Sequence, residues 1–129
     1  MSALNATIQS LLANAGVAAL VGRRIYPITA PQGGAVPYIV VHLISERDDF
    51  VLAGHAGYPE ARVSVDCRST KSTEAQMIGE AVKAALQPLH LAPSAGVTVS
   101  FRKEGSDYSD YADESQIYRR IMDFYARWQ

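Results

Sequence analysis

The 129-residue chain has a single cysteine, Cys67, so it cannot form a disulfide within itself. A lone cysteine is typical of a reducing compartment and cannot by itself supply a cysteine-based zinc site. A surplus of one charge is also missing, because 12 basic and 13 acidic residues leave a formal net charge of −1. A general nucleic-acid binder needs an excess of lysine and arginine against phosphate, so the composition argues against that class.

The first 20 residues have no basic segment and no long apolar run, because five polar residues interrupt them: Asn5, Thr7, Gln9, Ser10 and Asn14. A signal peptide needs a basic segment followed by an apolar one, and a membrane-spanning helix needs about 20 apolar residues. We therefore expect neither a leader nor a membrane span, and we expect the protein to be made and assembled in the cytoplasm.

Enzyme signatures are missing as well. The pair Gly33-Gly34 lacks the following Lys-Ser/Thr and the strand-to-helix context of a phosphate-binding loop. Adjacent loop carboxylates such as Asp48-Asp49 are more often turn formers than half of a metal site. Three histidines stand at positions without metal-ligand spacing, namely His42, His55 and His90. We predict no catalytic residue, no metal site and no cofactor, and a protein that is not an enzyme.

The remaining composition is that of an ordinary globular protein, with 48% hydrophobic and 19% charged residues. A chain of this length is typical of one domain, here residues 1–129. It can bury about two thirds of its unfolded surface, which is enough for a core without disulfides.

Two helices are predicted. Apolar residues recur at helical spacing between residues 3 and 21, with Ser2 as a cap and Gly22 at the position of a left-handed C-cap. A second helix begins with Thr70 or Ser72 as its cap, and Pro88 bends or ends it.

Four main strands are predicted, over residues 37–45, 60–67, 97–102 and 116–128. The first is apolar on both faces, which is typical of a covered central strand. The second alternates between apolar residues, such as Val63 and Val65, and polar ones, such as Ser64 and Asp66, which predicts a half-exposed strand with Cys67 in the core. The economical fold is α+β: a mainly antiparallel sheet of four to five strands with two helices packed on one face. Its other face would be partly apolar and would need a partner.

Two long loops are expected, over residues 46–59 and 104–115. Connections in compact domains usually have about 4 to 6 residues, and longer ones are often functional. Five of the 12 residues in the second loop are acidic and two are tyrosines, without a basic residue. We expect this loop to be solvated and mobile in the free protein. It lacks the alternating ligands of a calcium-binding loop.

Five arginines lie close to the predicted strands: Arg23, Arg24, Arg119, Arg120 and Arg127. One interpretation is protection of sheet edges and solubility. The other is a charged seam between subunits, in which these arginines pair with aspartates in the long loops of a neighbour. The residues alone leave both interpretations open.

Several segments, taken in order, resemble the tail-completion or tail-terminator proteins of long-tailed bacteriophages and phage-like gene transfer particles. The first helix leads into Arg24-Ile25-Tyr26-Pro27, and a proline opens the strand Pro37-Tyr38-Ile39-Val40-Val41. The similar segments that follow are Ala61 to Cys67, the alanine-rich helix from Glu74 to Leu86, and Tyr118 to Phe124. The resemblance covers nearly the whole chain, and residues 104–115 are its least similar part.

The resemblance implies a non-enzymatic virion protein that forms a ring, commonly of six copies, at the head-proximal end of the tail tube. Such a ring stops tube polymerisation and offers a surface to the neck or head-completion protein. The expected partners are therefore further copies of this chain, the tail tube protein and the neck protein, with no membrane and no sequence-specific nucleic acid. The alternative is another neck or minor tail component, such as a head-completion protein that binds the portal side.

On this hypothesis three groups of residues contact other subunits or the tube. The first long loop contributes Arg47, Asp48, Asp49, Phe50 and His55. The second long loop contributes Asp107, Tyr108, Asp110 and Tyr111. The outer face of the last strand contributes Arg119, Ile121, Tyr125 and Arg127.

Overall fold

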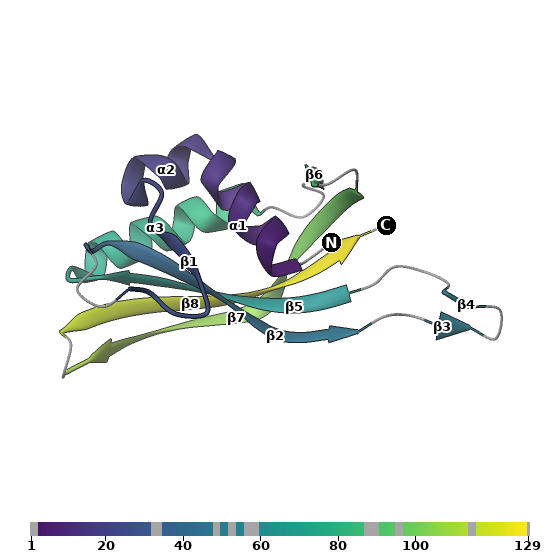
Figure 1. Cartoon of the computed structure of the whole chain (residues 1–129). Helices are drawn as coiled ribbons and strands as arrows, with labels where there is room; N and C mark the ends of the chain where they lie inside the picture. Colours follow the sequence, from purple (N-terminus) through teal and green to yellow (C-terminus); the bar gives the residue numbers. More distant parts are fainter. Residues whose placement is uncertain are drawn as a thin grey trace.

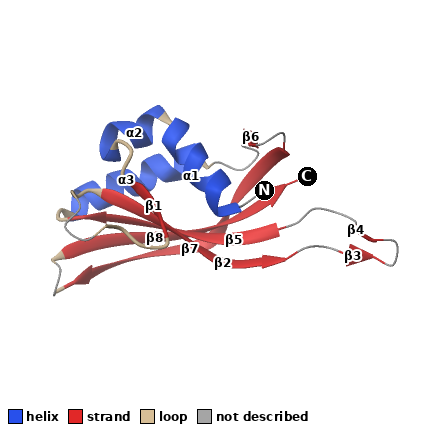
Figure 2. Ribbon diagram, viewed as in Figure 1, coloured by secondary structure: helices blue, strands red, loops and turns tan. Residues whose placement is uncertain are grey.

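The structure is a computed structural model that describes residues 3–31, 35–47, 50–51, 54–55, 60–86, 91–94, 97–113 and 116–128. Helices α1 (Ala3–Ala13), α2 (Ala15–Val21) and α3 (Ser72–Ala85) cover one face of the main sheet (Figures 1 and 2). The sheet has the order β1-β2-β5-β8-β7-β6. Its strands are β1 (Ile25–Pro27), β2 (Tyr38–Arg47), β5 (Glu60–Ser69), β6 (Leu91–Ser94), β7 (Val97–Ala112) and β8 (Ile117–Trp128).

The α+β class and the mainly antiparallel sheet with helices on one face are confirmed, since among the described strands only β1 pairs in parallel, with β2. Two counts differ from expectation. Within the described residues the main sheet has six strands instead of four to five, and three helices replace two. Beyond the four main strands, β1 and β6 are short segments of three and four residues at the two ends of the strand order.

The expected single helix over residues 3–21 is wrong, because Asn14 divides it. Asn14 is extended, with φ −86° and ψ 121°, and its side chain accepts a hydrogen bond of 3.0 Å from the backbone N–H of Val17. Asparagine in this role starts a new helix, so α1 and α2 meet at 86°. In the described part of the chain no single helix could cross a membrane, and only this bent pair passes by length and composition. Gly22 ends α2 with a positive φ of +62°, but its ψ of −126° lies outside the left-handed helical region expected for this cap.

Helix α3 is fixed by a residue of the preceding strand instead of the expected Thr70 or Ser72. The Oγ of Ser69 accepts a hydrogen bond of 3.1 Å from the N–H of Lys71 and donates one of 2.5 Å to Glu74. Lys71 occupies the N-cap position without a side-chain bond. The position of Pro88 lies outside the described residues.

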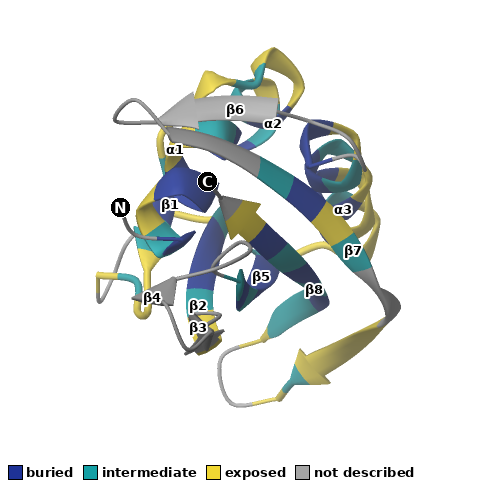
Figure 3. Cartoon of the chain, turned by 90° about the vertical axis from the view of Figure 1, so that its right-hand side faces the viewer, coloured by how far each residue is buried: buried dark blue, intermediate teal, exposed yellow. Residues whose placement is uncertain are grey.

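The core lies between the helices and the sheet, as the burial colours of Figure 3 show. Alternate residues of the central strands point toward the helices and are almost fully buried: Ile39, Val41, Val63, Val65, Cys67, Phe101, Met122, Phe124 and Ala126. They pack with residues from all three helices, which include Leu11, Val17, Val21, Ile78 and Val82. Burial raises the pKa of the Cys67 thiol, which keeps it protonated, so its predicted core position is confirmed.

The expected second loop is wrong over residues 104–112, because these residues belong to the 16-residue strand β7. They pair with β8 in register, for example Tyr108 with Ile121 and Asp110 with Arg119. A register shift lies between Lys103 and Asp107. The acidic segment is therefore half of a hairpin whose other strand supplies the opposite charges.

The first long loop is partly described. Its ends extend the sheet, since β2 runs to Arg47, which pairs with Glu60 of β5. Strands β3 (Phe50–Val51) and β4 (Gly54–His55) form a separate antiparallel pair, which lies beyond the ends of β2 and β5 in Figure 1. Asp48 and Asp49 lie outside the described residues, and the side chains of Arg47, Phe50 and His55 do too.

Candidate protein interface

The sheet face opposite the helices carries a set of ion pairs within and between neighbouring strands, here called the outer-face ion pairs. They join β5, β8 and β7, because strand alternation turns every second residue to this face. The closest N–O distances are 2.6 Å for Arg62–Asp123, 2.8 Å for Arg68–Asp66, 2.5 Å for Arg119–Asp110 and 3.4 Å for Arg127–Glu60. On this face Val40 and Ile121 are almost fully buried, whereas Tyr38, Ile117 and Tyr125 are half-buried and Tyr108, which pairs with Ile121, is exposed. The face is therefore partly apolar, as expected. The expected half-exposed β5 is wrong, because Ser64 and Asp66 are buried.

Asp66 is the centre of these ion pairs. Its Oδ2 accepts hydrogen bonds from Arg68 at 3.0 and 2.8 Å and lies 3.7 Å from the guanidinium of Arg119. Burial lowers the pKa of Arg68, but the hydrogen bonds to Asp66 and Tyr38 outweigh it and raise the pKa overall. Within the described residues, Oδ1 of Asp66 has no hydrogen-bond partner. Two arginines around one buried carboxylate hold β5 and β8 together at this point.

Two predicted interface residues, Arg119 and Asp110, pair with each other inside the chain. Arg119 donates two hydrogen bonds to Asp110, of 2.7 and 2.5 Å. This bond lowers the pKa of Asp110 and raises that of Arg119. The geometry is bidentate, which is the strongest arrangement of an arginine and a carboxylate.

The other strand face holds Arg120, which reaches α3 instead of solvent. Its guanidinium donates to the carbonyl oxygen of Gln76 and to Glu80, both at 3.1 Å, and to Asp107 at 3.0 Å. The hydrogen bond from Arg120 lowers the pKa of Asp107. A Cβ at Gly79 would lie 2.5 Å from Cδ of Arg120, so a glycine is needed where the arginine crosses the helix. Arg120 thus joins α3, β8 and β7 from within.

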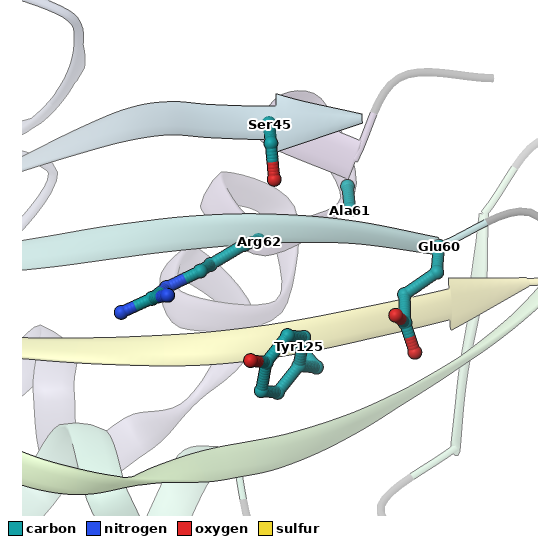
Figure 4. Close-up of a pocket in the computed structure, with 5 residues that line it drawn as sticks. All are labelled: Ser45, Glu60, Ala61, Arg62 and Tyr125. Carbon is teal, nitrogen blue, oxygen red and sulfur yellow. The ribbon is translucent and has the colours of Figure 1, made fainter. Parts of the chain in front are cut away.

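A hollow of about 350 Å³ lies on the outer face and is lined by Ser45, Glu60, Ala61, Arg62 and Tyr125 (Figure 4). The Tyr125 ring lies between two guanidinium groups, 4.8 Å from that of Arg102 and 6.0 Å from that of Arg62. Glu60 and Arg62 are already in ion pairs. These contacts fix the residues of the hollow in place and suit a contact surface better than a reacting group.

A smaller hollow, of about 190 Å³, lies near the other end of the same face and is lined by Tyr38, Arg68, Ala112, Ile117 and Arg119. Over the described residues, no three histidine, cysteine, aspartate or glutamate residues gather in a way that could hold a metal ion.

The predicted interface residues differ in exposure and in their contacts within the chain. Tyr108 and Tyr111 are exposed on β7, and the Tyr111 ring lies 4.5 Å from that of Tyr118. Asp107, Asp110, Arg119 and Arg127 are engaged within the chain. Ile121 is nearly buried, so it does not fit the exposed contact predicted for it.

Sequence reasoning missed a group of exposed apolar residues near β1 and β2, toward the end of the strand order away from β7: Ile28, Val36, Leu43 and Ile44. Leu43 and Ile44 were assigned to a central covered strand because the run 37–45 is apolar on both faces. The signal available was the length of that run, whose last residues extend past the part of β2 that pairs with β1.

The sequence model of the family described as tail completion protein gp17 matches residues 5–129. A chain of the virion of a native gene transfer agent (GTA) particle has the same fold, with a TM-score of 0.70 and 24% identity over 98% of this chain and 94% of that chain. A second solved structure gives a TM-score of 0.69 with 12% identity, over 99% of this chain and 97% of that one. No curated protein matches the sequence. Because the family model covers nearly its whole length, this chain belongs to the tail completion protein gp17 family.

Proposed function

We propose that this protein, a structural virion component by its family, is a tail terminator. Copies of it form a ring at the head-proximal end of the tail tube. The ring stops tube polymerisation and presents a surface to the neck or head-completion protein. The resemblance to tail terminators suggests six copies.

The observation that carries this proposal is a sheet that is open on two opposite sides. Within the described residues, no strand pairs with residues 42–47 of β2 beyond β5, or with residues 101–112 of β7 beyond β8. Open strand edges pair readily with other chains. Two different edges on opposite sides allow a heterologous contact, and such a contact gives a ring when the rotation between neighbouring copies closes.

The side chains of the outer face support a structural role. Their charges are already paired with one another, and the hollow among them is lined by engaged groups. The gene transfer agent chain of the same fold is part of an assembled particle, which supports assembly with other tail proteins as the role of this one.

The test is an assay of tube growth. Purified tail tube protein of the same particle is polymerised with and without this protein, and tube lengths are measured by electron microscopy. We expect shorter tubes that carry extra density at one end. When the protein is added after growth has ended, we expect the tube length to stay unchanged. Tubes of unchanged length with bare ends would contradict the proposal. Bare tubes together with binding to the portal-side proteins would favour the alternative neck component.

A further inference from the structure

We propose that copies of this chain associate head to tail, with the β7 edge of one copy paired to the β1–β2 edge of the next. The β7 edge is residues 101–112, and the β1–β2 edge is residues 25–28, 36 and 42–45. This inference rests on the proposed ring and names the two surfaces that would form it.

Exposed apolar side chains gather at the two edges. The described residues include seven large hydrophobic side chains that are exposed. Six lie on the two edges: Ile28 (63% exposed), Val36 (36%), Leu43 (43%) and Ile44 (54%) on the β1–β2 edge, and Tyr108 (59%) and Tyr111 (43%) on the β7 edge. The seventh, Met77, lies on α3. Such gathering at two sites, with little elsewhere, marks contact surfaces. The exposed end of β7 is yellow in Figure 3.

Ile28, on the β1–β2 edge, has a strained backbone. This residue has φ +68°, which is unfavourable for a β-branched side chain. Its N–H donates to the carbonyl of Val41 at 2.9 Å, and the next N–H, of Thr29, donates to Pro27 at 2.7 Å. Glycine would adopt this angle without strain. The isoleucine side chain is 63% exposed, so it gains little burial within the chain, whereas it adds apolar surface to the edge.

The strands at the two edges run in opposite directions. β2 is antiparallel to β5, β5 to β8 and β8 to β7, so β7 runs opposite to β2 and to its parallel neighbour β1. A second copy placed beside the first in the same orientation therefore brings β7 antiparallel to β1 and β2. Antiparallel pairing is the more stable of the two arrangements per residue. The copies need no inversion to pair.

The two edges also carry opposite charges at corresponding strand ends. Arg23 is exposed just before β1, and Asp113 is exposed just after β7. Neither has an ion-pair partner among the described residues. The pairing register of the sheet places both at the same end of their strands, because Ile25 is level with Ser109 across the sheet. Side-by-side copies thus bring Asp113 of one toward Arg23 of the next.

Each edge is therefore covered by a second copy of this chain. The β7 edge of one copy binds the β1–β2 edge of the next. Pairing of two β7 edges with each other is a different arrangement, with two-fold symmetry. That arrangement would leave the apolar β1–β2 edge uncovered.

The experiment uses one lysine substitution on each edge, because charged side chains block edge pairing. The β7 variant is Tyr108→Lys, the β1–β2 variant is Ile44→Lys, and Met77→Lys is the control at a similarly exposed site on helix α3. Sedimentation velocity and native mass spectrometry report the oligomeric state over a wide concentration range. Thermal unfolding confirms that each variant remains folded.

We expect the wild type and Met77→Lys to assemble alike, and each edge variant alone to be monomeric. An equimolar mixture of the two edge variants should give a one-to-one dimer, because one intact edge of each kind remains in the mixture. Dimers of Ile44→Lys alone would overturn the inference in favour of β7–β7 pairing. Oligomers that persist in both edge variants, or a wild type that is monomeric at every concentration, would overturn it as well.

The result is separable from the proposed function. If the wild type shortens tail tubes and its oligomer is insensitive to both substitutions, the edge inference is wrong and the terminator role stands. If the edges behave as expected and tubes grow to full length, the terminator role is wrong and the interface stands.

Discussion

The contact between Gly79 and Arg120 gives a prediction whose sign depends on the partner. Alanine is favoured over glycine inside a helix by about 1 kcal/mol, so Gly79→Ala alone would be expected to stabilise α3. The structure predicts the opposite, because the new Cβ would lie 2.5 Å from Cδ, 2.8 Å from Nη1 and 2.9 Å from Nε of Arg120. The arginine would have to leave its position.

The cost follows from what Arg120 binds there. It would lose hydrogen bonds to the Gln76 carbonyl and to Asp107, each about 1.5 kcal/mol for a charged donor. The pair with Glu80 adds little, since that carboxylate is largely exposed. Against the helical gain of about 1 kcal/mol, the net result is a loss of about 2 kcal/mol, or a fall of about 6–8 °C in the melting temperature.

A double-mutant cycle isolates the cause. In an Arg120→Ala background nothing opposes the new Cβ, so the same Gly79→Ala change should stabilise by about 1 kcal/mol. Denaturant unfolding of the wild type, both single variants and the double variant measures the four free energies. If Gly79→Ala stabilises the wild type too, Arg120 does not cross the helix at Gly79, and the role given to it is refuted.

The other predictions concern the core, the outer-face ion pairs and the β1–β2 edge. Phe124→Ala should lower the free energy of unfolding by about 3–5 kcal/mol, because this ring is fully buried, whereas Met77→Ala should change it by less than about 0.5 kcal/mol in the same denaturant titration. The pKa of Asp110 is lowered by Arg119 in the folded chain, so the pair stabilises at neutral pH, and this contribution is lost as the pH falls below the ordinary aspartate pKa of about 4. Asp110→Asn should therefore flatten the acid side of a plot of melting temperature against pH, and an unchanged slope would argue against the pair. Ile28→Gly should leave the melting temperature unchanged or raise it, because it removes the strain at φ +68°, and should weaken self-association in sedimentation; a variant that loses stability and assembles normally would contradict the edge role of Ile28.

The sequence was a good guide where periodicity and burial agree. The alternation from Ala61 to Cys67 correctly predicted which side of β5 packs under the helices. It failed on the polar side, since Ser64 and Asp66 are buried in a strand that pairs with β2 on one side and β8 on the other. One charged partner of Asp66, Arg68, is two positions away in the same strand, but the second, Arg119, is 53 positions away on β8.

The error over residues 104–112 has a related cause. An acidic, tyrosine-bearing segment was interpreted by composition alone, which indicates a solvated loop. The opposing charges were close by, because Asp110 and Ser109 pair with Arg119 and Arg120 across the hairpin. Aspartates before a turn and arginines at matching distances after it predict a charged hairpin, and that signal was available in the sequence. The break at Asn14 was local too, since asparagine is a poor residue inside a helix and a good one at its start.

The interface could not be located by the same reasoning, because its residues are ordinary in sequence and distinctive only in position. Within the described residues, Arg119 pairs with Asp110, Arg120 with Asp107 and Arg127 with Glu60, so these charges, which were expected to contact a neighbour, are engaged inside the chain. What remains available is the boundary of the sheet, where Ile28, Ile44 and Tyr108 are exposed beside open strand edges. An internally paired face also limits unspecific contacts between copies, because another protein must break an existing ion pair to form a new one. Association is then directed to the two edges, whose opposite positions suit a closed ring.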